Sequence, residues 1–303
     1  MFSKLLIVGG GLIGSSIARA ARDLADTIVI ADASPEARAT LERLCIADIV
    51  TPSGEGHHDC DLAILCVPPA RMREAAESFV PHMSGGILSD VGSHKGAIIE
   101  DLDFIPDSVA FIPGHPIAGT EFSGPDAGFA ELFQNRWCVL TPTDDTDPDA
   151  LETLTCFWEA LGSQVAVMDP ARHDLVLATT SHVPHLIAYT LVGTATDMER
   201  VTDNEVVKFS AGGFRDFTRI AASDPEMWRD VMMGNREAVL EVVDRFIEDL
   251  SALKRAIRWG EADTIEERFA RARDIRARIL DAGQDQPGFK RRANPPAPET
   301  SSD

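Results

Sequence analysis

The sequence has few basic side chains for its length. Among 303 residues, 28 Lys and Arg stand against 49 Asp and Glu, which gives a formal net charge of −21. Phosphate binding depends on clustered Lys and Arg, so this balance argues against a nucleic-acid partner and against an anionic membrane surface. The deficit is uneven, because residues 1–170 contain 26 acids and 9 bases, whereas residues 171–283 contain 20 and 16. An acidic small molecule therefore stays possible in the second half.

Cysteine and long apolar runs are also scarce. The 5 cysteines are an odd number and include no C-x-x-C pair, which excludes a disulfide framework and is typical of free thiols in a reducing cytoplasm. The apolar start of the chain is too short for a signal peptide, and no apolar run approaches the roughly 18 residues of a membrane span. We expect a cytoplasmic protein without a membrane partner.

Short buried strands alternate with amphipathic helices in the first half of the chain. The strands are expected at Lys4–Val8, Thr27–Ala31, Leu62–Val67, Ile87–Asp90, Val109–Ile112, Cys138–Thr141 and Gln164–Met168. Helices are expected at Ile13–Leu24, Pro35–Leu44, Arg71–Val80 and Asp149–Leu161. Such alternation predicts an α/β Rossmann-type fold with a doubly wound, mainly parallel sheet.

The pattern changes after Asp169-Pro170. Three long helical segments follow, at Ala171–Met198, Glu226–Trp259 and Glu261–Leu280, with almost no strand signal. Pro184 must break the hydrogen bond to the carbonyl of Thr180 and kink the first segment. We therefore predict an NAD-binding domain over 1–170, an all-α C-terminal domain over 171–283 and a disordered tail over 284–303.

A glycine-rich turn follows the first strand. Gly9, Gly11, Leu12, Ile13 and Gly14 belong to a G-x-G-x-x-G motif that opens a predicted helix. In that context the glycines allow a tight turn and close approach of the backbone, and the N–H groups of the helix N-terminus bind a pyrophosphate. The motif predicts a dinucleotide site.

An acidic residue ends the second strand. Asp32 can accept hydrogen bonds from both ribose hydroxyls of a dinucleotide and would repel a 2′-phosphate. No Arg or Lys follows within Ala33–Glu36. The sequence therefore predicts NAD as the cofactor in preference to NADP, and Asp32 or Ser34 can cap the next helix at the same time.

Three polar clusters follow the later strands and the predicted kink. They are Asp90–Gly96, Gly114–Glu121 and Ser181–His185, and a fourth, Asp216–Ile220, lies in the helical half. In order along the chain, with Gly9–Gly14 and Cys66–Pro69, these elements resemble the prephenate/arogenate (cyclohexadienyl) dehydrogenase family of tyrosine biosynthesis. The resemblance covers about residues 4–235, and the stretch Ser123–Pro142 is similar to bacterial enzymes that accept both substrates.

The resemblance implies a reaction and a set of site residues. NAD would take a hydride from the hydroxyl-bearing ring carbon of prephenate or arogenate, and the ring carboxylate would leave as CO2. His115 resembles the base for the hydroxyl proton, a role suited to an imidazole. Ser93 resembles its hydrogen-bonding hydroxyl and lies near the cofactor. Arg219 resembles the group that binds a substrate carboxylate through two parallel donors.

Further residues follow from the same resemblance. His185, His182, Ser181 and Glu121 would line the substrate pocket, and Val67 and Pro68 would contact the cofactor. A homodimer through the helical domain is implied as well. His94 stands where family members commonly carry a valine, and we favour a side chain that points to solvent over an altered cofactor contact or pH dependence.

Other interpretations stay open from the residues alone. A β-hydroxyacid-type NAD dehydrogenase has a similar organisation but uses a lysine of the helical half, and neither Lys208 nor Lys254 sits in such a motif. A non-catalytic NAD-binding sensor would not need His115 or Arg219. His182 and His185 could be half of a metal site, but no third ligand cluster accompanies them, so no metal is expected.

Overall fold

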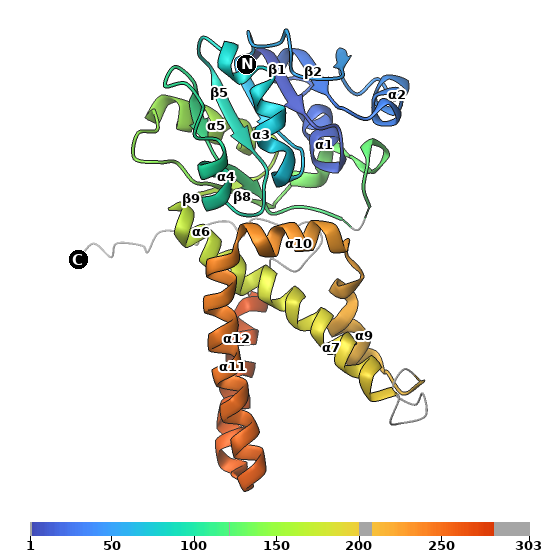
Figure 1. The fold of residues 1–303 in the computed structure, drawn as a ribbon, viewed down its shortest axis with the longest axis vertical. Coiled ribbons are helices and arrows are strands. Elements are labelled where there is room, and N and C mark those ends of the chain that lie inside the picture. Colours follow the sequence, from blue (N-terminus) through green and yellow to red (C-terminus); the bar gives the residue numbers. More distant parts are fainter. Residues whose placement is uncertain (1, 121, 200–207, 282–303) are drawn as a thin grey trace, which may run out of the picture.

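The computed structural model describes residues 2–120, 122–199 and 208–281. Glu121 and the tail 284–303, both subjects of predictions, lie outside the described residues. Figure 1 shows an α/β layer structure above a group of long helices that extend away from it.

Six parallel strands form the larger sheet, in the order β3-β2-β1-β4-β5-β6. Their bounds are β1 Phe2–Val8, β2 Ala25–Ala31, β3 Ile49–Thr51, β4 Leu62–Leu65, β5 Ile87–Asp90 and β6 Ala110–Ile112. The predicted Rossmann-type sheet is confirmed, and only the short β3 was missed. The strand order reverses between β1 and β4, which is where open α/β sheets bind ligands.

Helices cover both faces of this sheet (Figure 1). Their bounds are α1 Leu12–Ala20, α2 Pro35–Arg43, α3 Pro69–Glu77, α4 Gly96–Asp101 and α5 Pro148–Ala160. Because side chains alternate along a strand, Leu5 of β1 joins the core that includes Ile17 of α1, whereas Leu6 joins the core that includes Met72 of α3. Burial on both faces explains why the strands are continuous apolar runs.

A second, smaller sheet has the order β7-β8-β9. It consists of β7 Gly114–Pro116, β8 Trp137–Leu140 and β9 Gln164–Val167, with β7 antiparallel to β8 and β8 parallel to β9. The sequence predicted β8 and β9 but not β7, because a three-residue strand that contains Gly and Pro has little strand propensity. Its central residue is His115, whose backbone the sheet fixes opposite Val139.

The second half of the described chain is helical. Its elements are α6 Pro170–Leu177, a π-helical turn Ala178–His182, α7 Val183–Glu199, α9 Gly212–Thr218, α10 Pro225–Gly234, α11 Arg236–Trp259 and α12 Ala262–Asp281. The irregularity expected from Pro184 is the π-helical turn immediately before α7. The prediction of one helix over 226–259 is wrong, because Asn235 leaves helical geometry (φ −111°, ψ 35°) and separates α10 from α11.

Large apolar side chains are exposed on the long helices. Their small buried core is formed by Ala178, Val183 and Val239. Exposed apolar residues of α11 and α12 are Leu240, Phe246, Ile247, Leu250, Ile257, Trp259, Phe269 and Ile275. The α11–α12 pair extends away from the α/β layers (Figure 1), so these side chains have few neighbours within the chain.

One stretch contradicts the expectation that no apolar run reaches span length. The continuous helix Pro170–Met198 has 29 residues and a mean hydropathy of 1.3 in its most apolar window, which is long and apolar enough to cross a membrane. A single helix of this kind is weak evidence for a membrane span, because the core helix of a soluble protein can have the same length and hydropathy. Here the stretch carries buried, hydrogen-bonded polar groups, among them His173, Asp174 and His182.

Candidate functional site

The glycine-rich turn forms a close-packed cradle at the end of β1. Gly9 has φ +105°, and a Cβ there would lie 2.7 Å from the backbone of Cys66. A Cβ on Gly14 would lie 1.9 Å from the carbonyl oxygen of Gly9, so both positions require glycine. Gly11 precedes α1 without a side-chain cap and has open space beside it. No side chain therefore caps the N-terminus of α1, and its N–H groups are available to an anion.

Asp32 at the end of β2 organises the same corner. Its Oδ2 accepts a hydrogen bond from the N–H of Gly10 at 2.7 Å, and its Oδ1 accepts one from the N–H of Ser34 at 2.9 Å. Ser34 caps α2 by accepting from the N–H of Ala37 at 3.1 Å. Each oxygen of the carboxylate has a further lone pair that can accept a hydrogen bond from a hydroxyl.

A cavity of about 690 Å³ connects several predicted cofactor residues. Gly9, Gly11, Asp32, Val67 and Pro68 all line it. The other members of the predicted set lie elsewhere. Leu12 and Ile13 pack against the hydrophobic core, Gly14 lies in the first turn of α1, and Ser93 lies in the loop after β5.

A cation lies near Asp32, just beyond the segment Ala33–Glu36 that contains no Arg or Lys. Arg38, one turn into α2, donates from Nη1 to the carbonyl oxygens of Asp32 and Ala33 at 2.8 and 2.9 Å. The guanidinium thus binds the backbone of the turn. A helix brings side chains three to four residues apart to the same face, so a residue beyond Glu36 can still reach this turn.

A buried ion pair joins the loop after β5 to the strand that carries His115. Lys95 Nζ lies 2.5 Å from Oδ2 of Asp90 and donates to the carbonyl oxygen of Gly114 at 2.6 Å. The N–H of Gly114 donates to Oδ1 of Asp90 at 3.2 Å. Burial lowers the pKa of Lys95, although the carboxylate of Asp90 opposes that shift. The pair fixes the start of β7 and therefore the position of His115.

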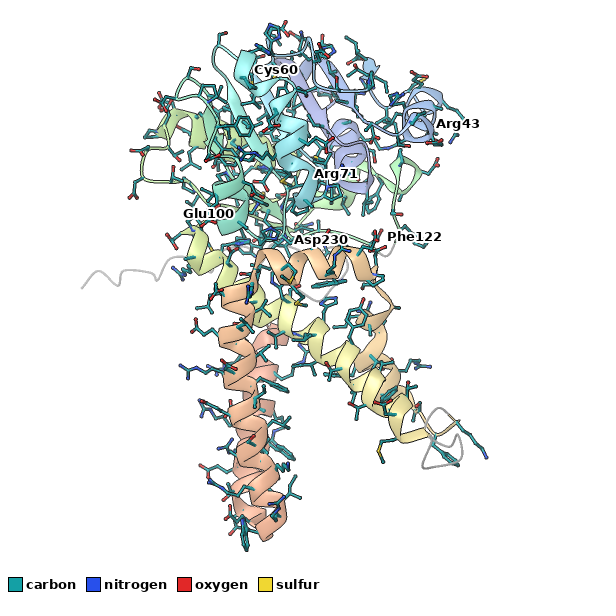
Figure 2. The ribbon with its side chains drawn as sticks, in the orientation of Figure 1. Arg43, Cys60, Arg71, Glu100, Phe122 and Asp230 are labelled. Carbon is teal, nitrogen blue, oxygen red and sulfur yellow. The ribbon has the colours of Figure 1, made fainter. Side chains whose placement is uncertain are left out.

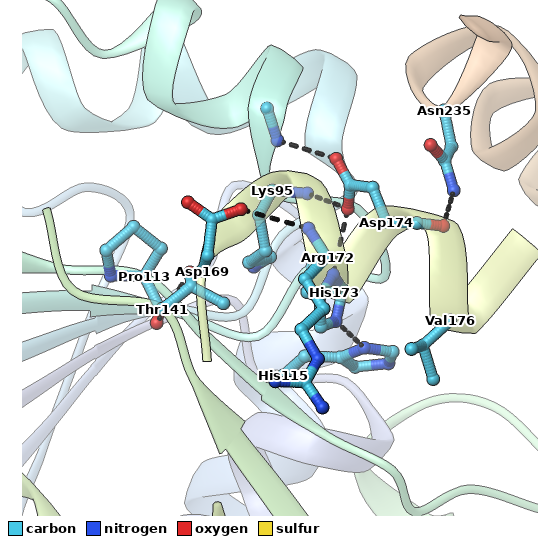
Figure 3. Close-up of polar contacts among 12 residues, drawn as sticks. Lys95, Pro113, His115, Thr141, Asp169, Arg172, His173, Asp174, Val176 and Asn235 are labelled. Atoms are coloured by element: carbon cyan, nitrogen blue, oxygen red, sulfur yellow. Dashed lines mark hydrogen bonds and ion pairs between the residues drawn. The ribbon is translucent and has the colours of Figure 1, made fainter. Parts of the chain in front are cut away.

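His115 is the first member of a chain of hydrogen bonds (Figure 3). Its Nδ1 lies 2.9 Å from Nε2 of His173, and Nδ1 of His173 lies 2.8 Å from Oδ1 of Asp174. The N–H groups of Lys95 and Gly96 donate to the same carboxylate at 2.8 and 2.9 Å. Burial would raise the pKa of Asp174, but the hydrogen bonds from His173 and from these two N–H groups outweigh it and lower the pKa.

The protons of this chain can be assigned from its end. An ionised Asp174 only accepts, so Nδ1 of His173 carries a proton and, in the neutral ring, its Nε2 accepts. His115 must then donate from Nδ1, which leaves the lone pair of its Nε2 free. Burial, together with the neighbouring His173, lowers the pKa of His115 well below its usual range. The geometry therefore presents an unprotonated imidazole nitrogen at neutral pH.

Asn235 and His182 of the helical half extend this chain of hydrogen bonds beyond Asp174. Nδ2 of Asn235 donates to the carbonyl oxygen of Asp174 at 2.8 Å and lies 3.0 Å from Nδ1 of His182. An amide nitrogen only donates, so Nδ1 of His182 accepts and the ring proton sits on Nε2. Burial lowers the pKa of His182 to about 4. His182 was predicted to line the substrate pocket, but only 1% of the residue is exposed, so it is buried below the surface.

His185, Trp228 and Arg219 form the next part of the cluster. His185 stacks on Trp228 with ring centroids 3.5 Å apart and a 22° interplanar angle. Its Nδ1 donates to the carbonyl oxygen of Ser181 at 2.8 Å, which leaves Nε2 as an acceptor. Burial lowers the pKa of His185, and the charge of the exposed Arg219 acts in the same direction. An imidazole edge and a guanidinium therefore lie near one another, the combination that binds a carboxylate.

The structure brings together side chains from both halves of the chain. His182 connects the two groups, because its ring lies 6.2 Å from that of Trp228. Figure 2 shows Phe122 and Asp230 at the level where the α/β layers meet α10. The lysines of the helical half, Lys208 and Lys254, are exposed. Among the described residues, no group of three or more His, Cys, Asp or Glu could hold a metal ion.

Two sequence interpretations need correction. The prediction that the side chain of His94 points to solvent is wrong, because only 3% of His94 is exposed and its ring packs against Gly234. His173 and Asp174 were not predicted, because their adjacency at a helix start is the only signal that the sequence offers. Their partner His115 is 58 residues away in sequence, a distance that no local pattern covers.

Comparisons with known proteins find relatives that match over most of the chain. Residues 17–167 match the family model described as the prephenate dehydrogenase nucleotide-binding domain, and residues 169–271 match the prephenate dehydrogenase dimerization domain. A cyclohexadienyl dehydrogenase of Zymomonas mobilis is 40% identical, covering 91% of this chain and 96% of its own. A prephenate dehydrogenase of Bacillus subtilis is 33% identical, covering 91% and 76%.

A solved structure shows the same similarity in three dimensions. The crystal structure of prephenate dehydrogenase from Aquifex aeolicus in complex with hydroxyphenyl propionate and NAD+ superposes with a TM-score of 0.86. The two chains are 34% identical, and the match covers 92% of this chain and 99% of the other.

Proposed function

Because the chain belongs to the prephenate dehydrogenase family, we propose that it oxidises prephenate, arogenate or both with NAD. Hydride passes from the hydroxyl-bearing ring carbon to the cofactor, the ring carboxylate leaves as CO2, and the ring becomes aromatic. The products are 4-hydroxyphenylpyruvate from prephenate and tyrosine from arogenate. The observation that carries this proposal is the hydrogen-bond chain from His115 through His173 to Asp174.

His115 acts as the base for the ring hydroxyl. A free lone pair on Nε2 supports this role, since the protons of the chain are held on the other side of the ring. The charge that develops on His115 as it takes the proton is stabilised through His173 by the ionised Asp174. Ser93, next to His94 in the loop after β5, is the hydroxyl partner of the same reaction.

Substrate carboxylates are held by the helical half. Arg219 supplies a guanidinium that has no ion-pair partner among the described residues and is close enough to His185 to influence its pKa. The acceptor Nε2 of His185 and the half-buried Ser181 complete the polar lining. The near balance of charge in residues 171–283 supports an anionic substrate there, since distant surface acids are screened by salt.

NAD is preferred over NADP. The cavity lined by Gly9, Gly11, Asp32, Val67 and Pro68 supports this, because a 2′-phosphate would meet the carboxylate of Asp32. Arg38 is bound to the backbone carbonyls of the turn, so at least one of its donors is already used. The cofactor supplies the hydride acceptor when bound.

The chain acts as a homodimer through its helical domain, residues 171–283. The exposed apolar side chains of α11 and α12 support this, since many large apolar side chains exposed on one pair of helices are typical of an interface. Size-exclusion chromatography with light scattering measures the mass directly. A mass equal to that of one chain would contradict the dimer.

One assay tests the proposed reaction. Purified protein is mixed with prephenate or arogenate and NAD, and NADH absorbance and released CO2 are followed together. Equal amounts of NADH and CO2 are expected with at least one substrate, while His115→Asn serves as the inactive control. Failure to oxidise either compound would overturn the proposal.

A further inference from the structure

His94 lies at the contact between the two halves of the chain. It follows Ser93 in the loop after β5. Only 3% of His94 is exposed, and its ring packs against the end of α10. A Cβ built on Gly234 would lie 2.2 Å from Nε2, 2.3 Å from Cε1 and 2.8 Å from Cδ2 of that ring. The ring therefore fills the space that a side chain at position 234 would need.

The loop on the His94 side of this contact is held rigidly. The next residue, Lys95, is anchored through Nζ to Asp90 and through its N–H to Asp174. Ser93, on the other side of His94, has no hydrogen-bonding partner of this kind among the described residues. The position of Ser93 therefore depends on the position of the His94 ring.

The other side of the contact leads to the hydrogen-bonded cluster. Gly234 is the last residue of α10, and the following Asn235 binds both His182 and the carbonyl oxygen of Asp174. Figure 3 shows Asn235 reaching Asp174 from a different helix. A shift at Gly234 would therefore move Asn235 and, through it, the support of His182 and Asp174.

We propose that His94 is a positioning residue whose ring, packed against Gly234, sets the distance between the loop that carries Ser93 and Asn235, the residue between α10 and α11. The proposal rests on the roles given above to Ser93 and to the His115–His173–Asp174 chain. His94 acts through these residues and needs no contact with the substrate.

The surroundings of His94 favour a neutral ring in this position. The charged or titratable groups that face it are Lys95 and Asp90 from its own side, His115 from β7, His173 and Asp174 from α6, and His182 from the π-helical turn. Burial lowers the pKa of His94, and Lys95 adds to the effect. Nδ1 is buried without a hydrogen-bond partner among the described residues, so shape is the property of the ring that the contact uses.

A double-mutant comparison tests the proposal. The variants are His94→Val, Gly234→Ala and the two combined, with Gly193→Ala as the control because a Cβ on that helical glycine meets nothing within 4 Å. For each protein, kcat with prephenate, Kd of NAD by direct binding and the thermal midpoint are measured.

Gly234→Ala should lower kcat by roughly tenfold or more, since displacements of about 1 Å at a reaction centre have effects of this size. The Kd of NAD should stay within about twofold, because the cavity that contains Asp32 and Val67 lies apart from this contact. His94→Val should lower kcat several-fold by removing the ring. In the double variant, the smaller valine makes room for the methyl group, so kcat should recover relative to Gly234→Ala alone.

Three results would overturn the inference: wild-type kcat in His94→Val, wild-type kcat in Gly234→Ala, or a double variant whose loss equals the product of the single losses. If Gly234→Ala does not fold, His94→Val and the double variant still decide, since a folded, more active double variant shows the rescue. Wild-type protein is assayed first. Absence of turnover there contradicts the proposed function, whereas wild-type turnover with multiplicative losses contradicts only this inference.

Discussion

Nδ1 of His115 lies 2.9 Å from Nε2 of His173, although the first residue belongs to strand β7 and the second to helix α6. The two rings meet edge to face with centroids 5.1 Å apart. Since Asp174 holds the other nitrogen of His173, the contact fixes which nitrogen of His115 is left unprotonated. The base of the proposed reaction is thus completed by the start of the helical half.

Removal of the base should abolish most of the turnover. His115→Asn should lower kcat by roughly 10²–10⁴, the usual contribution of general-base catalysis, and leave NAD affinity unchanged. Steady-state kinetics and direct NAD binding measure the two effects. A variant with near-native kcat would remove His115 from the mechanism.

The carboxylate behind the base can be tested by an isosteric change. Asp174→Asn replaces an acceptor by a group that can donate, so the tautomers of His173 and His115 are no longer imposed, and kcat should fall by roughly 10²-fold or more. Asp169→Asn is the matched control, because Asp169 caps the same helix through the N–H of Arg172 and is exposed. Equal kinetics in the two variants would refute the role of Asp174.

Substrate binding should depend on one arginine. Arg219→Gln should raise the KM for prephenate, because a lost charge-assisted pair costs on the order of 1.5–3 kcal/mol, with a smaller change in kcat. Arg215→Gln, one turn earlier and paired with Asp216 at the surface, is the control and should keep the native KM. An unchanged KM in Arg219→Gln would rule out carboxylate binding by this residue.

Cofactor choice should depend on the charge at position 32. Asp32→Asn keeps one acceptor oxygen, which can serve the N–H of either Gly10 or Ser34, and removes the repulsion of a 2′-phosphate. We expect the ratio of the NADP and NAD dissociation constants to fall by roughly tenfold, the effect of removing one like-charge contact. Equilibrium binding of both nucleotides measures the ratio, and no change would mean that other residues select the cofactor.

Stability should fall in mild acid. Burial lowers the pKa of His182 from 6.5 to about 4, so the unfolded chain binds this proton first as the pH falls. The contribution of His182 to the free energy of unfolding is complete above pH 6.5 and decreases, by up to about 3 kcal/mol, as the pH falls to about 4. Chemical denaturation at several pH values measures this, and His182→Gln should reduce the pH dependence. A variant as pH-sensitive as wild type would contradict it.

The fold was largely readable from local pattern. Apolar runs such as Ile87–Asp90 gave the parallel strands, and the spacing from Gly9 to Gly14 gave the cradle, because these features depend on residues close in the chain. The same locality explains the misses. Strand β7 has too few residues to form a pattern, and the break at Asn235 follows from contacts with Asp174 and His182.

The sequence by itself determined the nucleotide cradle and the strand–helix order, and its resemblance to a known family made His115 the candidate base. Only the tertiary structure decided that His173 and Asp174 orient this base, that His182 lies buried behind Asn235, and that His94 packs into the space beside Gly234. The reason is physical. Backbone conformation and amphipathic spacing are short-range properties, whereas burial, tautomer and pKa depend on groups that the fold brings together from distant segments.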